Sequence, residues 1–212
     1  MPALHGERAI DHLKEQGAYD SLAEAMVAVN YQANWQPRPQ LDNLGAAYEF
    51  KNTANNLLAY VNSDGIQVTS LGDAKKSWRL GLQLRAYGYG KTLGEVSSGE
   101  LRANKNRVEI QRSAIVNPQA AIEEWFTNTA RGIEQGFKIS RRPAIDRRLR
   151  GSGRLRLQLS VIGDLQASVN EAGTCATFRR DADNVLVSYD KLFVTDAKGR
   201  VLAARMRPEA ES

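Results

Sequence analysis

The segment EEWFTNTARGIEQGF, residues 123–137, decides the fold class of this chain. It places two runs of apolar and aromatic residues on either side of a short polar turn. This pattern predicts a β-hairpin with its tip near Thr129, Ala130 and Arg131, and with Gly132 available for a backbone conformation of positive φ. Because side chains alternate along a strand, Trp125 and Phe126 should lie on opposite faces, with one of them in the core.

The chain on both sides of this hairpin has the same character. Short alternating runs are separated by turn residues at intervals of about 8 to 12 positions, which is typical of antiparallel β proteins. We count at least eleven short strands, the longest at residues 78–87, where Tyr87 falls on the polar face, and the last two at 192–195 and 201–206. The pattern predicts a mainly β fold, an antiparallel β-sandwich in one domain over residues 46–207. The large supersandwich found among carbohydrate-active proteins is one version of that fold.

The N-terminal part of the chain has a different pattern. Residues 1–30 predict two short α-helices, the second opening with a capping box at Ser21-Leu22-Ala23-Glu24. Such short helices need a docking surface, either on the β domain or on a partner. Residues 31–45 lack periodicity and predict a linker, with Trp35 as an anchor on the β domain.

Composition narrows the possible functions. The 212 residues are 42% hydrophobic and 25% charged, as expected for a globular protein, and no run approaches the roughly 18 apolar residues of a membrane span. We recognise no signal peptide, so the protein is either cytosolic or has lost an export signal. The single cysteine, Cys175, excludes an internal disulfide, and His5 and His12 are the only histidines. We therefore predict no cofactor, no metal site and no assigned catalytic residue.

The central hairpin also holds the residues that could bind or cleave a sugar. Glu124 and Glu134 could fall on one face and supply the pair of carboxylates that glycosidases use. Trp125 could form a platform for a sugar ring. The alternative is that the glutamates are ordinary surface residues and that both aromatic side chains are covered. Gly136 marks a place where the ring of Trp125 could lie over the backbone.

Basic residues gather in one segment after the hairpin. Between residues 138 and 154 the only acidic residue is Asp146. The basic residues there are Lys138, Arg141, Arg142, Arg147, Arg148, Arg150 and Arg154. This loop could bind a polyanion through Arg141, Arg142, Arg147, Arg148 and Arg150. It lacks interleaved aromatic residues, which argues against nucleic acid and leaves a solvated loop as the alternative.

The stretch EWFTNTARGIEQGF, residues 124–137, resembles a known family. It is similar to the N-terminal β-rich domain of large secreted bacterial proteins that continue into FG-GAP (integrin-α-like) repeats. Further matches are AIDHLKEQGAYDSLAEAM (9–26), WRLGLQLRAYGYG (78–90), NRVEIQR (106–112) and LVSYDKLFVTDAKGRVLAARM (186–206). The resemblance implies a secreted or surface-attached module that precedes such repeats, and it supplies no catalytic residues.

Together these observations predict a non-catalytic β-sandwich module of a bacterial secreted or cell-surface protein. Its role would be adhesion, domain packing or assembly, with neighbouring repeat domains, another copy of the chain or surface glycans as partners. One alternative is a carbohydrate-binding or carbohydrate-active domain that uses Trp125, Glu124 and Glu134. The other is polyanion binding through the basic loop, residues 141–154.

Overall fold

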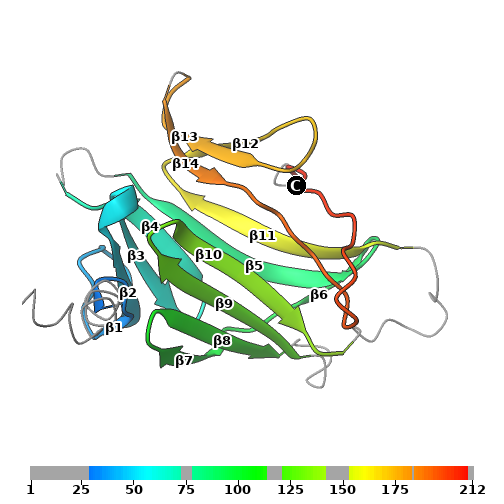
Figure 1. Ribbon diagram of the computed structural model, residues 1–212, viewed down its shortest axis with the longest axis horizontal. Coiled ribbons are helices and arrows are strands. Elements are labelled where there is room, and N and C mark those ends of the chain that lie inside the picture. Colours follow the sequence, from blue (N-terminus) through cyan, green and yellow to red (C-terminus); the bar gives the residue numbers. More distant parts are fainter. Residues whose placement is uncertain (1–28, 73–77, 114–120, 142–152, 183, 210–212) are drawn as a thin grey trace, which may run out of the picture.

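A computed structural model of the chain describes residues 29–72, 78–113, 121–141, 153–182 and 184–209 (Figure 1). This part of the chain is mainly β, with fourteen strands and one short 3-10 helix, η1 (Thr53–Asn55). The helices predicted within residues 1–28 lie outside the described residues. None of the described helices is long and apolar enough to cross a membrane.

The strands form three antiparallel sheets. The seven-stranded sheet has the order β1-β2-β3-β4-β5-β11, with β6 also paired to β5. Its strands are β1 (Asn34–Gln36), β2 (Ala47–Asn52), β3 (Leu57–Asn62), β4 (Gly65–Ser70), β5 (Leu80–Tyr89), β6 (Thr92–Glu95) and β11 (Leu155–Gly163). The four-stranded sheet, β10-β9-β8-β7, contains β7 (Glu100–Asn104), β8 (Arg107–Ser113), β9 (Ala121–Thr129) and β10 (Gly132–Ile139). The three-stranded sheet contains β12 (Gln166–Val169), β13 (Ala176–Arg179) and β14 (Val185–Tyr189).

The two larger sheets share one hydrophobic core, as a β-sandwich requires. The seven-stranded sheet contributes Phe50, Val61, Ile66, Leu80 and Leu82, and the four-stranded sheet contributes Val108, Ile110 and Phe126. Phe178 of the three-stranded sheet packs into the same cluster. Figure 1 shows this third sheet at one end of the sandwich, beside β11. The predicted antiparallel, mainly β fold is therefore confirmed.

The central hairpin forms as the sequence predicts. Thr129 pairs with Gly132, so the turn consists of two residues, and Gly132 has a φ of +127°. This positive φ suits glycine because a residue with a Cβ atom would be strained in that conformation. Phe126 is fully buried in the core, and Trp125 lies on the outer face of the sheet.

Two sequence predictions need correction in these strands. β1 lies inside the predicted linker and pairs with β2, where Trp35 contacts Tyr48 edge-on at 5.0 Å but stays half exposed. Tyr87, predicted on the polar face, is buried against Leu84 and Ile122. Here Leu159 and Gln158 of β11 pair with Leu84 and Ala86, so Arg85 is an extra residue on β5 and interrupts the alternation of that strand.

The last predicted pair of strands is also wrong. Between residues 192 and 206 the structure has a single isolated bridge, Thr195 to Val201. The predicted turn does form, because the carboxylate of Asp196 accepts hydrogen bonds from the backbone N–H groups of Lys198 and Arg200. Strand pairing does not extend from this turn, so residues 190–209 form an irregular segment that we call the C-terminal arm.

Candidate functional site

An arginine and a glutamate form an ion pair inside the sandwich. Arg112 on β8 and Glu124 on β9 are diagonal neighbours on the inner face of the four-stranded sheet, because Ile110 pairs with Glu124. Their side chains are 2% and 0% exposed. Nε and Nη2 of Arg112 lie 2.8 and 2.7 Å from the same oxygen, Oε2 of Glu124. Burial raises the pKa of Glu124, against the opposite effect of Arg112 and of a hydrogen bond from Gln135.

Two more polar side chains extend this pair toward the three-stranded sheet. Gln135 on β10 donates a hydrogen bond from Nε2 to Oε1 of Glu124 at 2.7 Å. The hydroxyl of Tyr189, on β14, donates in turn to Oε1 of Gln135 at 3.1 Å. Burial, together with the charge of Glu124, raises the pKa of Tyr189 to about 12. Both carboxylate oxygens of Glu124 are thus engaged, and the chain of contacts joins the four-stranded sheet to the three-stranded one.

The predicted pair of catalytic carboxylates does not form. Glu134 pairs directly with Thr127, so its side chain lies on the outer face of the sheet and is exposed. Glu124 pairs with Phe137 and is buried on the inner face. The two-residue turn sets this register, and a register that differed by one residue would reverse it. The prediction that Glu124 and Glu134 share a face is therefore wrong.

Trp125 lies in a stack of side chains on the outer face. Its ring lies against Gly136, where an added Cβ atom would come within 2.1 Å of the indole, so the predicted ring-over-glycine contact is confirmed. The guanidinium carbon of Arg107 lies over the same ring, 4.1 Å from its centroid. Arg107 is held by Glu109 at 2.7 Å and by Glu123 at 3.4 Å. Trp125 is half-buried in this stack, which reduces the ring surface that a sugar could reach.

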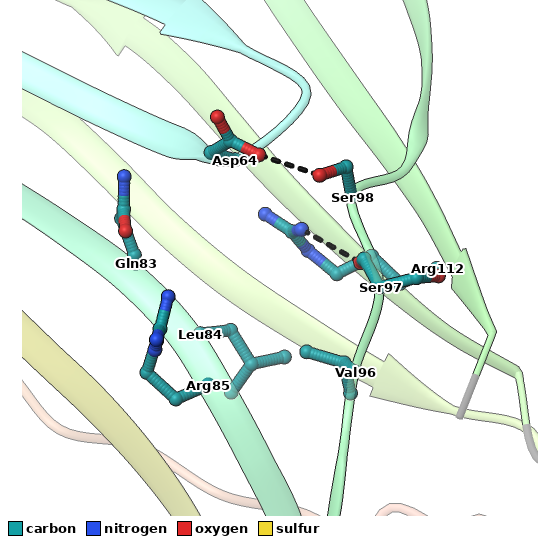
Figure 2. Close-up of a pocket in the computed structure, with 8 residues that line it drawn as sticks. All are labelled: Asp64, Gln83, Leu84, Arg85, Val96, Ser97, Ser98 and Arg112. Atoms are coloured by element: carbon teal, nitrogen blue, oxygen red, sulfur yellow. Dashed lines mark hydrogen bonds between the residues drawn. The ribbon is translucent and has the colours of Figure 1, made fainter. Parts of the chain in front are cut away.

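A polar pocket of about 210 Å³ lies where the chain crosses from one sheet to the other (Figure 2). On one edge, β5 pairs with β4 over residues 80–82 and with β6 over residues 86–89. Between these two pairings the edge is open, and the connection from β6 to β7, residues 96–99, passes beside it. The backbone N–H of Val96 donates to the carbonyl of Arg85 at 3.0 Å, and that of Gly99 donates to the carbonyl of Ser63 at 2.9 Å.

The polar groups of this pocket come from both sheets. Gln83 and Arg85 project from β5, and Figure 2 shows the guanidinium of Arg112 reaching toward the space beside them from β8. Nη1 of Arg112 donates to the carbonyl oxygens of Ser63 at 2.9 Å and Ser97 at 3.2 Å, so Arg112 holds the walls of the pocket in place. These walls also contain Asp64 and Ser98, whose side chains share a hydrogen bond of 2.6 Å.

The basic loop is described only at its ends. Arg141 follows β10 and is exposed, as is Arg154 just before β11. The other predicted contacts, Arg142, Arg147, Arg148 and Arg150, lie outside the described residues. Polyanion binding by this segment stays a prediction.

The buried pair has a signal in the sequence that the predicted sites did not include. Along β8 the buried positions are Val108, Ile110 and Arg112, and along β9 they include Glu124. A charged residue at an apolar position of an alternating strand indicates a buried, paired charge. The pocket had no such signal, because Arg85 and Arg112 are far apart in the sequence.

Comparison of the chain with protein families, with curated proteins and with solved structures found no match. The described residues contain no group of three or more His, Cys, Asp or Glu side chains placed to hold a metal ion.

Proposed function

We propose that the chain is a non-catalytic β-sandwich module of a bacterial secreted or cell-surface protein, with a role in adhesion, domain packing or assembly. The observation that supports this most directly is the exposed apolar surface of the C-terminal arm. Phe193 and Val201 are 71% and 68% exposed, and Leu192 and Leu202 are also exposed. Large apolar side chains that gather on one exposed segment are typical of interaction surfaces.

Contacts near the C-terminal end of the arm hold it on the rest of the fold. The backbone N–H of Met206 donates to the carbonyl of Gly173 at 2.7 Å, and Glu209 forms an ion pair with Arg156 on β11. Within the arm, the N–H of Leu202 donates to the carbonyl of Val194 at 2.9 Å. Figure 1 shows the arm running from β14 away from the three-stranded sheet and then turning back. The exposed side chains are therefore presented by an anchored segment, which favours a role in packing.

The buried network supports a role other than catalysis for Glu124. Both of its oxygens already accept bonds from Arg112 and Gln135. Three further parts of this proposal rest on the resemblance and on the sequence pattern. They are the role in a surface protein, the docking of the N-terminal helices and the supersandwich variant of the fold.

Sedimentation velocity tests whether the chain assembles with a second copy of itself, which is one of the proposed roles. Interfaces of standard size associate at micromolar concentrations or below, so we expect the mass of the wild-type chain to rise between about 1 and 100 µM. The change Phe193→Ser with Val201→Ser should keep the chain monomeric. Val161→Ser is the control, because Val161 is exposed on β11, outside the arm. A wild-type chain that stays monomeric over the whole range would contradict assembly through the arm.

A further inference from the structure

We propose that the pocket between β5 and the crossing segment, residues 96–99, binds a small acid that also has hydroxyl groups, with a hexuronate as the simplest member of that class. This site differs from the apolar surface of the arm and uses none of the residues that the sequence predicted. The inference goes beyond the proposed function, because it would give the module a specific ligand.

The first argument is the position of the two arginines. Arg85 is exposed, and it is the residue of β5 that the register shift leaves without a partner on β11, between Leu84 and Ala86. Arg112 is 2% exposed and approaches from the inner face of the other sheet. The pocket therefore has one guanidinium at its mouth and one at its base. Guanidinium groups bind carboxylates through charge-assisted, directional hydrogen bonds.

The second argument is that several donors around the pocket lack acceptors. Within the described residues, neither Arg85 nor Gln83 forms a side-chain hydrogen bond or an ion pair. Nη2 of Arg112 is close to Glu124 but makes no well-aligned hydrogen bond. A buried donor without an acceptor is unfavourable, and a ligand oxygen would satisfy it.

The third argument is charge balance, which limits the type of acid. The pocket also holds Asp64, and Glu124 already offsets the charge of Arg112. A dianionic phosphate would meet the carboxylate of Asp64, whereas a monocarboxylate with hydroxyl groups could place its charge near Arg85 and donate a hydroxyl to Asp64. Ser98 occupies only Oδ1 of Asp64, so the second oxygen can accept such a bond.

The size of the pocket sets the size of the ligand. Its volume of about 210 Å³ is below the range of about 300–1,000 Å³ that is common for drug-sized ligands. Leu84 and Val96, whose side chains face each other in Figure 2, are the only apolar residues that line it, and because both pack in the core its surface is almost entirely polar. A single sugar ring that presents its polar edge to the arginines matches both the size and the polarity.

The test is an NMR titration of the full chain with glucuronate, monitored at the backbone amides of Arg85, Ser97 and Ser98. We expect saturable shifts at these amides. Glucose lacks the carboxylate and acetate lacks the hydroxyl groups, so each should bind about tenfold more weakly, the ratio expected for the loss of one good polar contact. Tighter binding of a tri-uronate than of glucuronate would assign the site to a polysaccharide, and equal binding would assign it to the free acid.

Two matched variants complete the test. Arg85→Gln keeps a polar, exposed side chain and should weaken glucuronate binding at least about tenfold. Arg102→Gln is the control, since Arg102 is an exposed arginine on β7 that does not line the pocket. The proposal is overturned if glucuronate causes no shifts, if acetate binds as well as glucuronate, or if Arg85→Gln binds like the wild-type chain.

Discussion

The two faces of the four-stranded sheet hold the same kinds of charged residue in different surroundings. On the inner face, Arg112 of β8 meets Glu124 of β9, and both side chains are at most 2% exposed. On the outer face, Arg107 of β8 meets Glu123 of β9, with side chains 32% and 20% exposed. Both pairs join the same residue types on the same two strands, so they can be compared for the effect of burial.

The difference shows how burial changes the role of an ion pair. Water still reaches the outer pair, and exposed pairs of this kind contribute only about 0–1 kcal/mol to stability. The inner pair has lost its hydration, so each charge depends on its partner and on the surrounding hydrogen bonds. Arg112 also binds the carbonyl oxygens of two segments that are distant in sequence. The inner pair thus fixes the geometry of the sandwich, whereas the outer pair mainly positions Arg107 over Trp125.

The largest effect should come from breaking the inner pair. Glu124→Gln keeps the shape of the side chain but leaves the charge of Arg112 buried without a counter-ion. We expect the free energy of unfolding to fall by about 3–5 kcal/mol, the usual effect of removing one partner from a buried pair. Urea unfolding at neutral pH measures this change.

The matching outer change is Glu123→Gln on the same strand. It should lower the free energy of unfolding by less than about 1 kcal/mol. A double-mutant cycle with Arg112→Met should then show strong coupling between positions 112 and 124. Equal losses for Glu124→Gln and Glu123→Gln would show that burial does not distinguish the two faces.

An intermediate effect should come from packing on the outer face. In Gly136→Ala the new methyl group would overlap the indole of Trp125, which lies 2.1 Å from that position. Moving the ring should reduce stability by about 1–3 kcal/mol, as overpacking does elsewhere, and should alter tryptophan fluorescence. Gly94→Ala is the control, because its nearest neighbour would be 3.9 Å away. A neutral Gly136→Ala variant would mean that the stack over Gly136 does not stabilise the sheet.

The sequence predicts features that depend on residues close together in the chain better than features that depend on residues far apart in the chain. The central hairpin was predictable because its alternation and its glycine act over a few residues. The placement of Glu134 depends on register, which shifts by one residue with small changes in the turn, and our prediction was wrong there. The pocket depends on the meeting of Arg85 and Arg112 at a crossing between sheets, and no local pattern records such a meeting.

The C-terminal arm illustrates a different limit. Residues 192–206 alternate well enough to predict two strands, and the turn between them forms. A strand also needs a neighbour with free hydrogen-bonding groups, and within the described residues the arm pairs with itself at a single bridge. The alternation therefore correctly indicated apolar side chains at regular intervals, but it did not indicate whether another strand would cover them.

A small effect should also come from Arg107→Gln on the outer face. This change removes the guanidinium from above Trp125 and leaves Glu109 and Glu123 without their shared cation. An exposed cation–π contact contributes about 0.5–1 kcal/mol and exposed ion pairs add little, so we expect a loss of about 1 kcal/mol. Repeating the urea unfolding in about 1 M salt should reduce the difference from wild type, because the Debye length falls to about 3 Å.

Glu124→Gln should keep its full effect in the same salt, since ions do not reach the interior. If salt reduced both effects equally, the inner pair would have to be accessible to solvent, and the contrast between the two faces would fail.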